Sequence, residues 1–188
     1  MRLSRIKHLG LVVLLSIPFY CTAQDTTRVM NKHQIGFNAS KFISLFNEQT
    51  NSLELAYRMA IKPPYSIRAG LSFEQNTADD GIFDGSVRIG VDKYFKRTRK
   101  WDFYYGMDAF FSREVVNSSE RETSRFGGFI FLGILFHIGD HFSLSTEPNF
   151  SVLRVVFRDD DSFDPEANRE WYEYSIGNIG QIQINFHF

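Results

Sequence analysis

The chain has little with which to lock a fold covalently, since Cys21 is the one cysteine in 188 residues. An internal disulfide is therefore excluded, and stability has to come from packed side chains or from a non-aqueous surrounding. The formal net charge is only −1, which excludes the basic surface that a nucleic-acid-binding protein needs. Long apolar runs are also missing beyond residues 1–23. The longest, "FIFLGILF" at 129–136, is about half of the roughly 18 residues that a membrane-spanning helix requires.

Aromatic residues are plentiful: the chain has Phe 20, Tyr 8 and Trp 2, with a mean hydropathy of −0.24. This mixture suits surfaces on which apolar and polar residues alternate. The alternation is clearest in "SLELAYRMAIK" at 52–62 and in "YSIRAGLSFE" at 65–74. A period of two predicts strands, and Pro63-Pro64 between them predicts a hairpin turn, because proline cannot continue a strand ladder.

The first 23 residues have the features of a secretory signal. Arg2, Arg5 and Lys7 precede the apolar run "LGLVVLLSIPFY", and the small residues of "CTA" follow it. This pattern predicts a signal peptide at 1–23 that is cleaved to leave a β-barrel domain at 24–188. A lipid-anchored Cys21 is the alternative, and it is disfavoured because a bulky tyrosine precedes the cysteine.

The alternating pattern recurs along the chain and predicts eight strands, at 33–45, 52–62, 65–74, 87–95, 101–111, 126–138, 142–157 and 171–188. Each is close to the length that a tilted strand needs to cross a bilayer. Long polar connections ("NEQTNS", "QNTADDGIFDG", "REVVNSSERETS" and "RDDDSFDPEANRE") alternate with short ones ("KPP", "KRTRK" and "GDH"). Together these features predict an all-β fold, an eight-stranded antiparallel up-and-down transmembrane β-barrel.

A soluble barrel of the lipocalin kind is the alternative, with apolar residues inside and charges outside. In the early strands, however, one face is aliphatic and aromatic, and the other mixes charge with glycine and serine. A narrow polar lumen accepts the second face, and lipid accepts the first. The segment 126–138 departs from this rule, because Phe129, Phe131 and Leu135 fall on its expected inner face.

The last residues, "IQINFHF", carry apolar residues at every second position: Ile182, Ile184, Phe186 and Phe188. This ending resembles the C-terminal signal of Gram-negative outer-membrane β-barrels, and the chain from residue 24 onward resembles the small eight-stranded, OmpA-type group. The resemblance implies an outer-membrane location, contact with outer-membrane lipid and recognition by the barrel-assembly machinery. It assigns no functional residue beyond this terminal motif.

Nine charged residues are expected inside the lumen: Glu54, Arg58, Arg68, Glu74, Arg88, Asp92, Asp102, Asp108 and Glu147. Folding the hairpins predicts cross-strand ion pairs of Arg88 with Asp108 and of Arg68 with Asp92. One interpretation is a gated ion path. The favoured one is a structural network that neutralises charge in a lumen barely wide enough for its own side chains.

A lipid-modifying enzyme is a further alternative, and it would need a histidine beside a hydroxyl or an acid at the outer rim. His33, His137, His141 and His187 are all expected at the opposite, turn end, so no catalytic residue is assigned. A metal site between His33 and His187 is conceivable, but solvated histidines are favoured because no further ligands follow at metal spacing. No metal and no cofactor are predicted.

Two charged connections are also interpreted as solvated surface. The acidic loop with Asp159, Asp160, Asp161, Asp164 and Glu166 lacks the spacing of an EF-hand, so a cation site is disfavoured. The basic turn "KRTRK" at 96–100 is expected to be a solubilising cap. The sequence therefore predicts an outer-membrane barrel with a structural, adhesive or partner-binding role through its extracellular loops. A narrow channel and an accessory subunit of a secretion or assembly complex remain as alternatives.

Overall fold

The computed structural model describes residues 31–45, 50–76, 81–116, 121–159, 169–177 and 181–188. The predicted signal segment lies outside these ranges. The described elements are β1 (His33–Asn38), α2 (Ala39–Ser44), β2 (Thr50–Lys62), β3 (Tyr65–Asn76), β4 (Ile82–Arg97), β5 (Trp101–Val116), β6 (Arg121–His137), β7 (Phe142–Thr146), β8 (Asn149–Asp159), β9 (Arg169–Gly177) and β10 (Gln183–His187).

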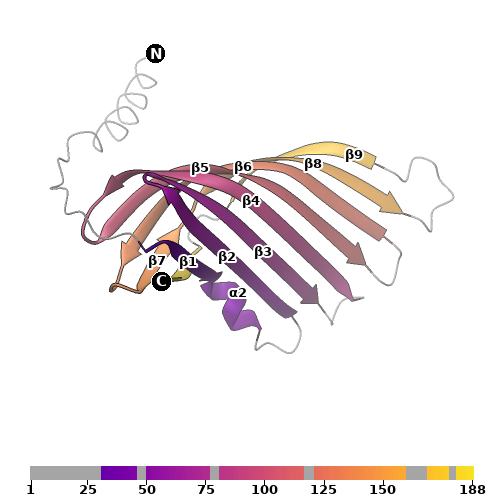
Figure 1. Ribbon diagram of the computed structural model, residues 1–188. Coiled ribbons are helices and arrows are strands. Elements are labelled where there is room, and N and C mark those ends of the chain that lie inside the picture. Colours follow the sequence, from indigo (N-terminus) through magenta and orange to yellow (C-terminus); the bar gives the residue numbers. More distant parts are fainter. Residues whose placement is uncertain (1–30, 46–49, 77–80, 117–120, 160–168, 178–180) are drawn as a thin grey trace, which may run out of the picture.

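Antiparallel pairing carries the wall from β1 through β2, β3, β4 and β5 to β6. Strands β7 and β8 both pair with β6 and together form the next strand of the wall. On their other side, β7 pairs with β10, and β8 pairs with β9. Pairing of β10 with β1 completes the circle, with Gln34 opposite His187 and Asn38 opposite Gln183. The wall is thus a closed eight-stranded antiparallel barrel (Figure 1), and this fold class is confirmed.

The opening strand is shorter than predicted. It ends at Asn38, whose extended backbone and side-chain oxygen cap a short helix by accepting hydrogen bonds from the amides of Ser40 and Lys41. The predicted strand at 33–45 is therefore wrong beyond Asn38. The alternation of apolar residues could not predict this change from strand to helix. The helix begins because of a hydrogen bond from one side chain, and the spacing of apolar residues carries no information about that bond.

Helix α2 lies against β2 and β1 at the loop end of the barrel (Figure 1) and reaches β3 through one side chain. The ammonium of Lys41 donates to the hydroxyl of Ser72 at 3.0 Å, and the hydroxyls of Ser44 and Ser52 are 2.5 Å apart. Strand β1 reaches only to Leu55 of β2, and β9 pairs with β8 as its one strand neighbour in the described part of the chain. The barrel is therefore less regular near its loop end.

Several of the other strands are longer than predicted, and all four long connections are therefore shorter. Residues 75–76 and 82–85 belong to β3 and β4, while 113–116 and 121–124 belong to β5 and β6. The ladders continue into polar sequence because cross-strand charges face each other there. Arg113 bonds Glu122 at 2.7 Å, and Arg125 bonds Glu114 at 2.8 Å.

The short connections are tight turns as predicted. The amide of Thr98 donates to the carbonyl of Trp101 at 2.8 Å, and the amide of Ile138 donates to the carbonyl of Phe142 at 3.0 Å. These turns gather at one end, where the segment ending at Phe188 also lies (Figure 1). At the opposite end, Gly81 enters β4 with a positive φ of 69°, a conformation that glycine adopts without strain.

The two faces of the wall differ sharply. Ile89 and Leu71 point outward with 65% and 60% of their surface exposed, whereas Arg58 and Arg68 point inward with 6% exposed. In β6 the inner positions are apolar, and Phe131 and Leu135 are buried beside Tyr104. The backbone of Gly133 lies opposite Tyr104, and any side chain on this glycine would collide with the tyrosine ring.

Candidate functional site: the lumen and its ion network

Glu147 is the centre of the lumen. It lies between β7 and β8, next to Pro148, and is buried. Arg68 donates to both of its carboxylate oxygens at 3.1 and 2.6 Å, Arg58 donates at 2.9 Å, and the hydroxyl of Tyr104 donates at 2.6 Å. One carboxylate therefore binds two guanidinium groups and a phenol that come from three different strands.

Two further carboxylates pair with the same two arginines. Nε of Arg58 lies 2.7 Å from Asp92, and Nε of Arg68 lies 3.2 Å from Asp108. The guanidinium of Arg58 also stacks on Tyr104, 4.3 Å from the ring centroid. Charges removed from water are tolerated only when they are paired in this way and satisfied by hydrogen bonds. Each arginine of the cluster is therefore paired with two carboxylates, one of which, Glu147, is shared between them.

The two predicted cross-strand ion pairs, Arg88 with Asp108 and Arg68 with Asp92, are wrong, because the strands pair in a different register. Arg88 lies opposite Phe110, and Asp108 lies opposite Gly90, so the predicted register is shifted by two residues. The same shift applies between β3 and β4, where Arg68 lies opposite Gly90. A shift of two leaves every side chain on its expected face and changes only its partner.

The remaining predicted lumen residues lie above and below this cluster. Arg88 pairs with Glu54 at 2.9 Å, toward the loop end. Asp102 bonds Nε2 of His137 at 2.9 Å, toward the turn end. Glu74 is exposed near the loop end of β3, opposite Asp84. The structure thus brings Arg58, Arg68, Asp92, Asp108 and Glu147 into one cluster and leaves the other four outside it.

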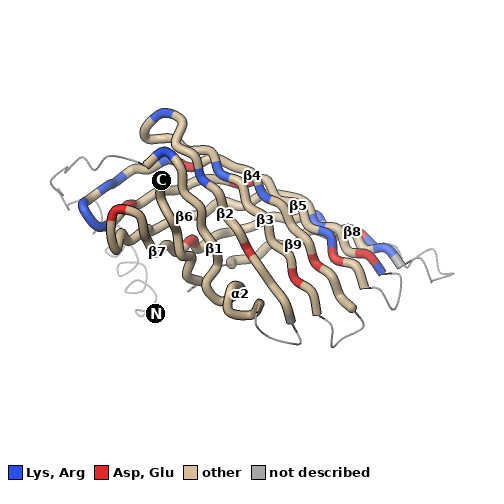
Figure 2. The backbone as a smooth tube through the Cα atoms, turned by 60° about the horizontal axis from the view of Figure 1, so that its bottom comes forward, with Lys and Arg blue, Asp and Glu red and all other residues tan. Residues whose placement is uncertain are grey.

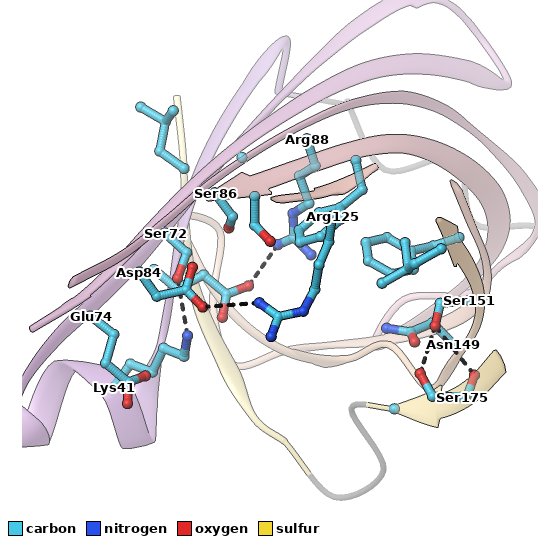
Figure 3. A pocket seen from close by; sticks show the side chains of 18 residues that line it. Lys41, Ser72, Glu74, Asp84, Ser86, Arg88, Arg125, Asn149, Ser151 and Ser175 are labelled. Carbon is cyan, nitrogen blue, oxygen red and sulfur yellow. Dashed lines mark hydrogen bonds and ion pairs between the residues drawn. The ribbon is translucent and has the colours of Figure 1, made fainter. Parts of the chain in front are cut away.

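A cavity of about 330 Å³ opens in the loop half of the lumen. Figure 3 shows Ser72, Ser86 and Arg88 on one side of it and Ser151 and Ser175 on the other. Its lining residues are Lys41, Glu54, Gly70, Leu71, Ser72, Glu74, Asp84, Ser86, Arg88, Phe110, Ser112, Arg125, Phe129, Asn149, Ser151, Leu153, Ser175 and Gly177. Above the cavity, the bond from Arg113 holds the pKa of Glu122 below its usual value.

The described histidines lie at the turn end. His33 bonds the hydroxyl of Tyr57 at 2.6 Å, and Nε2 of His187 lies 2.7 Å from the hydroxyl of Ser143. No group of three or more His, Cys, Asp and Glu residues in the described ranges is arranged to hold a metal ion. The basic turn at 96–100 lies at the same end, and Figure 2 shows further Lys and Arg along the strands and, together with Asp and Glu, at the opposite end. The acidic segment 160–168 falls outside the described residues.

The outer surface of the barrel is apolar over most of its circumference. Large apolar side chains at least 44% exposed include Ile61, Leu71, Val87, Ile89, Val91, Phe95, Trp101, Tyr105, Met107, Ile130, Leu132, Phe142 and Trp171. In the final segment, Ile182, Phe186 and Phe188 are exposed while Asn185 and His187 are buried, so the alternation continues there. The described residues include no helix long and apolar enough to span a membrane.

Two features of the site were not predicted. Tyr104 was missed, although the inward phase of Asp102 and Asp108 places it on the same face of β5. The serines of the cavity were missed as well, because serine is common on any polar strand face. Only the register, which places Ser72 opposite Ser86 and Ser86 opposite Ser112, gives them a shared position.

The fold and site define a class of protein: a closed eight-stranded antiparallel β-barrel with a charged, plugged lumen and an apolar exterior. None of the family models with which the chain was compared matches it, and none of the curated proteins or solved structures does either.

Proposed function

We propose that the chain is an integral outer-membrane β-barrel protein that acts through its extracellular loops in a structural, adhesive or partner-binding role. One observation carries the proposal: ions are buried inside the barrel while large apolar side chains cover its outside. A barrel surrounded by water would require the reverse arrangement.

The apolar surface is too large to face water without a cost in free energy. Exposed apolar patches beyond a few hundred Å² are unusual on proteins in water. Here the apolar residues run around the wall, and the backbone hydrogen bonds are closed into a ring, which is the arrangement that lets strands cross a bilayer. Trp101 and Phe142 near the turns, with Trp171 near the loops, suit the aromatic belts of the two membrane interfaces.

The proposed mechanism is display on a rigid cylinder. The network around Glu147 ties β2, β3, β4 and β5 to the segment between β7 and β8, so the lower barrel is cross-linked from within. The connections at the other end are then free to contact an extracellular partner. The proposal also includes export by the 1–23 signal and recognition of the final strand by the barrel-assembly machinery.

The alternatives have weaker support. A lipid-modifying enzyme would need a histidine at the loop end, whereas His33, His137, His141 and His187 lie at the turn end. A channel would need a path past Glu147 and its two arginines. An accessory role in a secretion or assembly complex is compatible with the same barrel, and no described feature distinguishes it from display.

Cysteine labelling of intact cells tests the location and topology together. Ser162→Cys lies in the long connection after β8, and Thr98→Cys lies in the turn between β4 and β5. We expect a membrane-impermeant maleimide to label Ser162→Cys in intact cells and to label Thr98→Cys only after the outer membrane is permeabilised. The unsubstituted chain serves as the control for Cys21. Labelling of Thr98→Cys in intact cells, or a protein that stays monodisperse without detergent, would contradict the proposal.

A further inference from the structure

We propose that the cavity in the loop half of the lumen is a binding site for a neutral, hydroxyl-rich ligand of the size of a mono- or disaccharide. Small-molecule sites occupy roughly 300–1,000 Å³, and this cavity, at about 330 Å³, lies at the small end of that range. The inference does not depend on the medium around the barrel, because the cavity lies on the inner face of the wall.

The cavity is a closed-ended site and not a passage. Asp108 and Arg68 lie one step below Phe110 and Gly70, on the turn side of the cavity, and they are bonded to each other and to Glu147. A ligand that enters from the loop end therefore meets the ion network at the bottom. A cavity closed at one end can hold a ligand but cannot pass it through the barrel.

The charges in the cavity argue against an ionic ligand. Three cations, Lys41, Arg88 and Arg125, are matched by three carboxylates, Glu54, Glu74 and Asp84. The cations are also engaged: Lys41 donates to Ser72, Arg88 to Glu54, and Arg125 to Glu114. An anion at Arg88 or Arg125 would have to displace Glu54 or Glu114, and a cation at Glu54 would have to displace Arg88. A neutral polar ligand can bind without breaking these ion pairs.

Hydroxyl groups supply the complementary recognition. Ser72, Ser86 and Ser112 form a row across β3, β4 and β5, each directly opposite the next. Ser86 and Ser112 make no side-chain hydrogen bond to another described residue, so their hydroxyls are available. A hydroxyl both donates and accepts, and a row of them therefore matches a ligand that carries several hydroxyls of its own.

Two phenyl rings complete the site. Phe110 and Phe129 project into the cavity from β5 and β6, with ring centroids 4.8 Å apart. The aliphatic face of a sugar ring packs against an aromatic face, while its hydroxyls point sideways to polar groups. Hydroxyls beside two half-buried phenyl rings that line a cavity are a combination that a purely structural lumen does not require.

The test uses the whole chain folded in micelles of a zwitterionic detergent that carries no sugar. Maltose, lactose and N,N′-diacetylchitobiose are titrated separately, and amide resonances are followed by heteronuclear NMR. We expect at least one disaccharide to shift the amides of Ser72, Ser86 and Ser112 in a saturable way, with inorganic phosphate producing no such shift. The proposal is overturned if none of the three sugars shifts these amides, or if phosphate shifts them equally.

Adjacent phenylalanines on opposite faces of β5 provide a matched pair of variants. Phe110→Leu removes a ring from the cavity, and we expect binding about tenfold weaker. Phe111→Leu removes a ring from the outer wall and is expected to leave binding unchanged. Ser86→Ala, which removes one hydroxyl and no bulk, is expected to weaken binding by about two- to tenfold. Equal effects of Phe110→Leu and Phe111→Leu would overturn the site.

Discussion

Single side chains in the lumen show why buried charge does not unfold this barrel. Arg58 is 6% exposed, yet each of its donor nitrogens has an acceptor, on Asp92, Gln34, Tyr94 or Glu147. Its positive charge is shared between two carboxylates and lies over an aromatic ring. The network is therefore costly to interrupt, because removing one partner leaves other charges buried without compensation.

Glu147→Gln tests this at the residue scale. The substitution keeps the shape of the side chain and removes the charge that Arg58 and Arg68 share. Each arginine keeps one aspartate, so we expect the free energy of unfolding to fall by about 1.5–3 kcal/mol, the contribution of a hydrogen bond to a charged group. Urea titration in detergent, followed by tryptophan fluorescence, measures the change. Glu170→Gln is the matched control: it breaks the fully exposed pair with Arg154, and we expect no measurable loss. Equal midpoints for the two variants would contradict the central role of Glu147.

At the scale of one element, β4 illustrates how a strand serves two environments. Arg88 and Asp92 point into the lumen, and Val87, Ile89 and Val91 point outward. Helix α2 follows the same rule over a shorter length, since Lys41 bonds Ser72 inside while Ile43 is 71% exposed. Strand β4 and helix α2 therefore each contribute one polar and one apolar face, whereas β6 has Phe131 and Leu135 inside and Ile130 and Leu132 outside.

Charged substitutions on the outer face distinguish hydrocarbon from water. Ile89 lies near the middle of β4, and Ile61 lies beside the turn of the β2–β3 hairpin, with exposed fractions of 65% and 61%. If lipid surrounds the wall, we expect Ile89→Arg to cost about 2–4 kcal/mol in vesicles and Ile61→Arg about 0–1 kcal/mol. Unfolding equilibria in phospholipid vesicles measure both. Costs that are equal and near zero would indicate that water surrounds the barrel.

For the whole molecule, the decisive feature is the combination of a closed wall with a filled lumen. The eight-stranded wall leaves room only for its own side chains below the cavity, and Tyr104, Phe131 and Leu135 pack there beside the ion network. The cavity above is open toward the loops and ends on this layer. This arrangement favours the proposed role of the barrel as a scaffold for its loop end over a role as a channel.

Planar-bilayer recording tests whether the ion network around Glu147 closes the lumen. We expect the reconstituted chain to show no sustained ion conductance, because Glu147, Arg58 and Arg68 close the path with bonds of 2.6–3.1 Å. A large outer-membrane porin in the same bilayer is the positive control. Stable conductance steps from the purified chain, with the porin absent, would contradict a closed lumen and favour the channel.

Much of the architecture was predictable from local pattern. A period of two in the segments at 52–62 and 65–74 identifies strands and their faces, because successive side chains in a strand point to opposite sides. Pro63-Pro64 identifies a turn. These features depend on residues close in sequence, so the strand count, the antiparallel order and the inward set of charged residues could be predicted.

What the sequence by itself determined was which residues face inward; what only the tertiary structure decided was which of them meet. Glu147 and Arg58 are 89 positions apart, and a shift of two residues in any hairpin would give both different partners without moving either to the other face. The central place of Glu147 and the shared row of cavity serines depend on such long-range register, whereas the helix after Asn38 begins at a local cap. Register is set by the packing of the closed barrel as a whole, because alternation alone is satisfied equally well by every even shift.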